Sequence, residues 1–101
     1  MHTPINQEEF LDLLDQAIFE TRDMLSMIES EGEDGELGEN AGVFEVLEGM
    51  LVELHAEICA GRHTFGGSSL AYADLLVRFR SRIPFADVLE MLNAVQKSGF
   101  P

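Results

Sequence analysis

Hydrophobic positions in the first third of the chain recur with the spacing of an α-helix. Leucines and isoleucines occupy successive a and d positions of a heptad from Leu11 to Ile28, with Thr21 as the one polar member. Acidic residues fall mostly off this stripe. The helix has two alternative N-terminal caps, which are Thr3 followed by Pro4 and Asn6 paired with Glu9. The pattern predicts an amphipathic helix over residues 7–30, about 36 Å long.

A second helical pattern is apolar around more than half of its circumference. One seam contains Phe44, Leu47, Leu51, Leu54 and Ile58, and the adjacent seam contains Val43, Val46 and Met50. Asn40 is a favourable N-cap, and Gly61 is placed to end the helix in the left-handed conformation, so we expect a helix from Asn40 to about Ala60. Such a broad apolar surface needs more than one packing neighbour, which makes this helix the central element.

Residues 31–40, between these two helices, contain three glycines and five acids. Helix propensity is low at that glycine density, and the like charges repel, so we predict an acidic, flexible loop. An EF-hand alignment on Gly35 places Ser30, Gly32 and Ala41 at the first, third and twelfth positions. Three essential oxygen donors are then missing, and a calcium site is not predicted.

The remaining residues predict two shorter helices. The third runs from about Leu70 to Arg80 and is capped by Ser68 or Ser69. Residues 77–83 also alternate with a period of two, which is typical of a strand, but the only strand partner would be another copy of the chain. Helix is therefore favoured there. Pro84 can begin a fourth helix that continues to about Lys97 and ends at Gly99.

The fold predicted from these segments is all-α. A chain of 101 residues has the length of one domain, so we assign residues 1–101 to a single helical domain. We predict a four-helix bundle in which the two long helices form an antiparallel hairpin and the two shorter helices pack across it.

The charge of the chain is strongly negative, with 19 acidic and 6 basic residues and a formal net charge of −13. Residues 1–57 contain 16 acids and one base, whereas residues 58–101 contain three acids and five bases. This balance argues against direct nucleic-acid binding. No basic, apolar leader is visible, and four glutamates interrupt residues 41–60, so we expect a soluble cytoplasmic protein without a membrane span.

His55, Cys59 and His63 are the candidate metal ligands. Their spacing of four would align two nitrogens and one sulfur on a continuous helix, and these are donors that zinc accepts. Gly61 is expected to end the helix before His63 and break this alignment. The simpler interpretation is that Cys59 is a small buried apolar residue and that the histidines are partly exposed. These three residues are therefore kept only as candidate metal ligands, and no cofactor is predicted.

Residues 61–68 do not form a nucleotide-binding loop, because Gly67 stands at the lysine position and the segment follows a helix. Backbone amides from Gly66 to Ser69, with Arg62 nearby, would still suit an anion, although ordinary helix capping needs the same residues and is favoured. No nucleophile, base and acid occur in a recognisable catalytic pattern. The chain is therefore more consistent with a binding protein than with an enzyme.

These features predict a non-enzymatic protein-interaction or regulatory module. We expect a basic protein partner to contact carboxylates of the first helix and of the acidic loop. These are Asp12, Asp15, Glu31, Glu33, Asp34, Glu36 and Glu39. The broad apolar surface of the second helix also predicts a two-fold homodimer. The alternative is a helical bundle that binds a metal or small ligand through His55 and Cys59.

Overall fold

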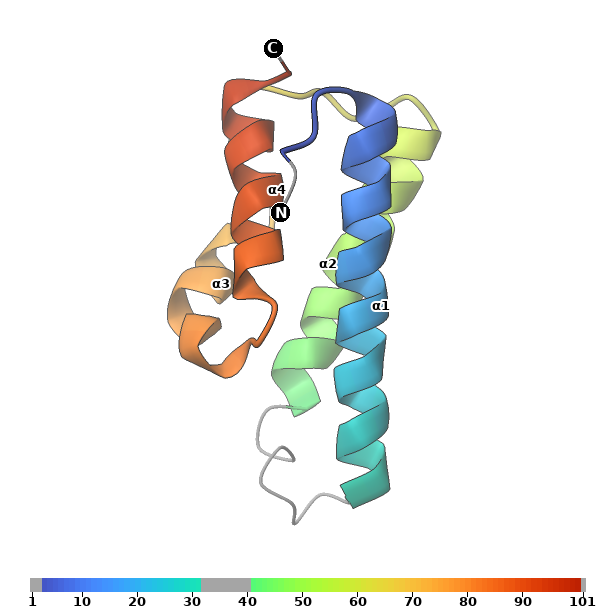
Figure 1. Cartoon of the computed structure of the whole chain (residues 1–101), viewed down its shortest axis with the longest axis vertical. Helices are drawn as coiled ribbons and strands as arrows, with labels where there is room; N and C mark the ends of the chain where they lie inside the picture. Colours follow the sequence, from blue (N-terminus) through green and yellow to red (C-terminus); the bar gives the residue numbers. More distant parts are fainter. Residues whose placement is uncertain (1–2, 32–40, 101) are drawn as a thin grey trace.

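A computed structural model describes residues 3–31 and 41–100 of the chain (Figure 1). Over these residues it contains four α-helices, one short 3-10 helix and no strand. The helices are α1 (Gln7–Glu31), α2 (Ala41–Cys59), α3 (Ala73–Phe79), η2 (Arg80–Arg82) and α4 (Ala86–Ser98). The predicted all-α fold is confirmed. Of the predicted acidic loop, Glu31 belongs to α1 instead, and residues 32–40 lie outside the described residues.

The two long helices, α1 and α2, run antiparallel and form a hairpin, as predicted (Figure 1). Completely buried side chains include Phe10 and Leu14 of α1 and Leu47 and Leu51 of α2. Thr21, the polar member of the α1 stripe, is also completely buried, and its hydroxyl donates to the Ala17 carbonyl at 2.7 Å. The stripe therefore packs without leaving this hydroxyl unpaired.

The start of α1 is set by Asn6, whose Oδ1 accepts a hydrogen bond from the backbone N–H of Glu9 at 2.9 Å. This contact selects Asn6 over Thr3-Pro4 as the N-cap. The Glu9 carboxylate accepts from the N–H of Ile5 at 3.3 Å, so its contact lies one residue before that of a standard capping box.

The end of α2 is a Schellman motif centred on Gly61, which has the predicted positive φ, at +72°. The N–H of Gly61 donates to the Ile58 carbonyl at 3.0 Å, and the N–H of Arg62 donates to the Glu57 carbonyl at 2.9 Å. The helix therefore stops before His63. Asn40, the predicted cap at the other end, lies outside the described residues.

The third helix starts later than predicted, at Ala73, and no side chain caps it, so the Ser68 or Ser69 cap was wrong. The residues before it are held instead by α4, because the N–H of Leu70 donates to Asn93 Oδ1 at 2.8 Å. Residues 77–82 continue as α3 and η2, which rules out the strand alternative. The fourth helix also begins two residues after Pro84, at Ala86, and ends at Gly99.

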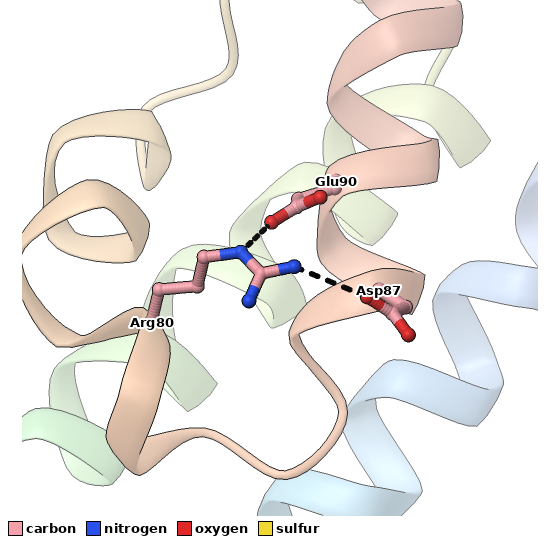
Figure 2. A network of polar contacts seen from close by, with 3 residues as sticks. All are labelled: Arg80, Asp87 and Glu90. Atoms are coloured by element: carbon pink, nitrogen blue, oxygen red, sulfur yellow. Dashed lines mark hydrogen bonds and ion pairs between the residues drawn. The ribbon is translucent and has the colours of Figure 1, made fainter.

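The C-terminal helices cover part of the hairpin: α4 packs against α1, and α3 contacts α4 and α2 (Figure 1). Figure 2 shows Arg80 of η2 bridging to α4, where its Nε donates to Glu90 and its Nη2 lies 3.3 Å from Asp87 Oδ1. The hydrogen bond to Glu90 raises the pKa of the Arg80 guanidinium above its ordinary value. The second seam of α2 is only partly covered, since Val46 remains 51% exposed.

Candidate functional site

The outer face of α1 carries an exposed aromatic ring among carboxylates. Phe19 is 68% exposed, and its helical neighbours Asp12, Asp15 and Asp23 are exposed as well. Steps of three and four residues separate these four positions, which places them on one side of the helix. We call Asp12, Asp15, Phe19 and Asp23 the acidic face of α1.

Two of the predicted partner-binding residues, Asp12 and Asp15, therefore lie on the same face of α1, but Asp15 has an additional contact. Its Oδ1 lies 3.0 Å from Nε2 of His55 on α2. Glu31 is the last residue of α1, and its side chain is not described. The predicted loop carboxylates, Glu33, Asp34, Glu36 and Glu39, lie outside the described residues, so their part in a site stays a prediction.

His55 and Cys59 lie one turn apart on α2, with His55 Nδ1 3.6 Å from Cys59 Sγ. Cys59 is exposed, so the prediction that it is a buried apolar residue was wrong. It is the last residue of α2, and the described residues that follow it leave this side of the helix uncovered. Asp15, His55 and Cys59 consequently form a connected, solvent-accessible group.

His63, the third predicted ligand, belongs to a different contact. Its Nε2 lies 2.6 Å from Gln96 Oε1 on α4, and its ring packs edge-on against Phe65. Within residues 3–31 and 41–100, no group of three or more His, Cys, Asp or Glu side chains is arranged to hold a metal. The three-ligand site is not formed, because the chain turns away at Gly61 as the sequence indicated.

The possible anion site at Gly66 to Ser69 is also not formed. The N–H of Gly66 donates to the Gln96 carbonyl at 2.7 Å, and the N–H of Gly67 donates to the Lys97 carbonyl at 2.9 Å. These amides are therefore occupied by the C-terminal end of α4. The following helix begins only at Ala73, so no helix N-terminus is available at Ser69.

An open cleft of about 360 Å³ lies between α2 and the segment that leads to α3. Met50 and Leu54 contribute apolar surface, and Glu53 and Glu57 contribute carboxylates. Glu57 is already 3.8 Å from Arg62, which partly balances its charge. Sequence reasoning missed this cleft because its lining combines residues from α2, the following segment and α4.

No family model, curated protein or solved structure matches this chain. Within the described part of the chain, no helix combines the length and the apolar character needed to cross a membrane.

Proposed function

We propose that this chain is a non-enzymatic interaction module that binds a basic protein through the acidic face of α1. The observation that carries this proposal is the 68% exposure of Phe19 between exposed carboxylates. Aromatic residues are enriched in protein interfaces, whereas a large exposed aromatic ring contributes little to folding. A cytoplasmic location is part of the proposal and is consistent with a single cysteine.

Phe19 and its surrounding carboxylates have complementary roles in this proposal. Burial of a phenylalanine side chain in a partner's pocket contributes roughly 1.5–3 kcal/mol. The carboxylates attract a positively charged partner and orient it during the encounter, which acts mainly on the association rate. The predicted loop carboxylates would enlarge the same negative surface. A partner with basic side chains around an apolar pocket therefore suits the acidic face of α1.

The test compares two variants that remove exposed hydrophobic side chains at different places. The wild-type chain is used to capture partners from its native host, and the captured protein is then purified and its affinity measured. Phe19→Ser should weaken binding about tenfold or more, which corresponds to about 1.4 kcal/mol. Val77→Ser is the matched control, because Val77 is 81% exposed on α3, away from the acidic face.

Salt dependence tests the electrostatic part of the same proposal. The Debye length falls from about 10 Å at 0.1 M salt to about 3 Å at 1 M, so affinity should decrease steeply over this range. Asp12→Asn with Asp23→Asn should reduce chiefly the association rate. If affinity is insensitive to salt and Phe19→Ser binds as tightly as the wild type, the acidic face is only a solvated exterior.

We also propose that the chain forms a two-fold homodimer through the outer side of α2. Support comes from Val52, which is 40% exposed on a helix that the rest of the described chain covers on one side only. Light scattering should give twice the mass of one chain at micromolar concentration. A single-chain mass under every condition would contradict the dimer and leave the proposal for the acidic face untouched.

A further inference from the structure

The separation of the side-chain donors on α2 matches the spacing of two ligands on one zinc ion. Zn–N bonds of about 2.0 Å and Zn–S bonds of about 2.3 Å at a tetrahedral angle place the two donors roughly 3.5 Å apart. In this structure His55 Nδ1 lies 3.6 Å from Cys59 Sγ. Cys59 is exposed and the His55 side chain is 33% exposed, so a metal ion can approach the pair without unfolding of α2.

Asp15 fixes the orientation of the His55 ring through the opposite nitrogen. Its carboxylate oxygen lies 3.0 Å from His55 Nε2, and a negatively charged acceptor at this distance favours a neutral ring that carries its proton on Nε2. The lone pair of the neutral ring is then on Nδ1, on the side of Cys59. A carboxylate bonded to the second nitrogen of a ligating histidine is the usual support for a zinc ligand.

One chain supplies only half of a zinc site. Structural zinc is held by four protein ligands, but among the described residues no third side chain is arranged with His55 and Cys59 to hold the ion, because Asp15 lies at the opposite nitrogen of the His55 ring. His63 is held by Gln96 instead. A two-fold axis beside α2 would bring a second, identical pair to the same ion.

We propose that one Zn²⁺ joins two copies of this chain, coordinated by His55 Nδ1 and Cys59 Sγ of each. This inference rests on the homodimer proposed above and names what holds it together. Binding removes the thiol proton from each Cys59, so two protons are released to solvent for each zinc bound. The two thiolates balance the charge of the ion, and the resulting two-sulfur, two-nitrogen set is a common structural zinc site.

The surface around His55 and Cys59 allows a second α2 to approach closely. Gly49, Val52, Ala56 and Cys59 form an exposed strip of small, uncharged residues along α2, and Ala60 continues it just after the helix. The strip borders a groove of about 290 Å³ between α1 and α2. In a chain with a net charge of −13, an uncharged strip is where two copies meet with the least repulsion. Glu45, at its far end, is about 21 Å from Cys59 along the helix.

The first experiment uses the purified full chain in a reductant that does not bind zinc. Zinc is added in steps while the mass is followed by light scattering and the bound metal by elemental analysis. The expected result is a mass that doubles as zinc reaches one ion for every two chains. Replacement of zinc by Co²⁺ should produce the tetrahedral absorption bands together with a thiolate charge-transfer band.

Variants then test the ligands, their support and the surface separately. Cys59→Ser and His55→Gln should abolish the doubling, whereas His63→Gln is the matched control and should preserve it. Asp15→Asn should weaken zinc binding about 10–100-fold without changing the ratio of one ion to two chains. Ala56→Glu, which keeps all ligands on an intact helix, should prevent pairing. Circular dichroism confirms that each variant is folded.

Three outcomes would contradict the zinc site. They also show whether the homodimer proposal fails together with it or stands without it. A dimer that forms equally without zinc and with Cys59→Ser would leave the homodimer standing and refute the metal. One zinc per chain with no change in mass would refute both. A dimer that only reductant dissociates would be linked by a disulfide between two Cys59 residues, and this too would refute the metal.

Discussion

In the hairpin of α1 and α2, completely buried side chains such as Phe10 and Leu47 are held almost entirely by apolar packing. The polar contacts between α1 and α2, such as Asp15 with His55, lie at the surface. The C-terminal half also contains apolar core residues, but there buried polar side chains cross between the elements. The buried Tyr72 hydroxyl donates to the Leu89 carbonyl at 2.7 Å, and the buried Gln96 amide donates to the Thr64 carbonyl at 3.0 Å. The hairpin is therefore stabilised mainly by its apolar stripes. The C-terminal half depends in addition on specific hydrogen bonds between its elements.

This difference determines which features of each region can be predicted from short stretches of the sequence. An apolar stripe is a property of one segment, because residues three and four positions apart share a face whatever they pack against. A hydrogen bond from Gln96 to Thr64 requires two residues separated by 32 positions, and neither shows it by local spacing.

The largest effect is expected from truncation in the hairpin core. Leu47→Ala removes a completely buried side chain of α2, and it should lower the free energy of unfolding by about 2–5 kcal/mol. Leu75→Ala is the counterpart on α3, where the side chain is half-buried, and it should cost about 1 kcal/mol. Urea denaturation followed by circular dichroism checks both. Equal losses would show that α3 is packed as tightly as the hairpin.

The sequence predicted the hairpin well and the C-terminal details less well. The bounds of α1 followed from its stripe and Asn6, and the end of α2 followed from Gly61, since both signals act within one turn of the helix. The third helix was placed too early. Leu70 fits a helical pattern, but its N–H donates to Asn93 of α4, a partner 23 residues away.

In the candidate site too, the sequence predicted the arrangement within one helix but not the contacts between elements. Spacing correctly placed His55 and Cys59 on one side of α2, and Gly61 correctly indicated that His63 would not join them. Exposure of Cys59 was missed because it depends on which neighbours fail to cover that side of α2. The contact between Asp15 and His55 was missed because it requires the register of α1 against α2.

A smaller loss is expected when a polar partner is removed from the C-terminal half. Gln96→Leu keeps a side chain of similar size but removes the contacts to the Thr64 carbonyl and to His63 Nε2. Because both partners are partly accessible to water, the cost should be about 1–3 kcal/mol. Hydrogen exchange should show faster opening at Gly66 and Gly67. Unchanged stability and exchange would mean that backbone contacts alone hold this segment.

Tyr72→Phe should destabilise the chain by about 1 kcal/mol, because the Leu89 carbonyl loses one of its hydrogen-bond donors. The hydroxyl also has a pH-dependent effect. Burial raises the pKa of Tyr72 far above its usual range, so the folded chain keeps its proton after the unfolded chain has lost it.

The sign of that effect is a loss of stability at high pH. Above about pH 10, where an unfolded tyrosine ionises, the free energy of unfolding should fall by about 1.4 kcal/mol for each pH unit. The chain contains one tyrosine, so phenolate absorbance reports this residue alone and should appear together with unfolding. Tyr72→Phe should lack this contribution. Phenolate formation in a chain that remains folded would contradict the assignment.

The smallest effect is expected at Thr21, the buried polar residue of the hairpin. Its hydroxyl donates to the carbonyl of Ala17 in the same helix, one turn earlier, so it connects no two elements. In Thr21→Val the Ala17 carbonyl keeps its position in the helical hydrogen-bond series, and the added methyl group occupies the place of the hydroxyl. Stability should therefore change by less than about 0.5 kcal/mol in either direction, as expected for residues of similar helix propensity. A loss as large as that of Gln96→Leu would show that a hydroxyl bonded within its own helix matters as much as an amide that joins two segments.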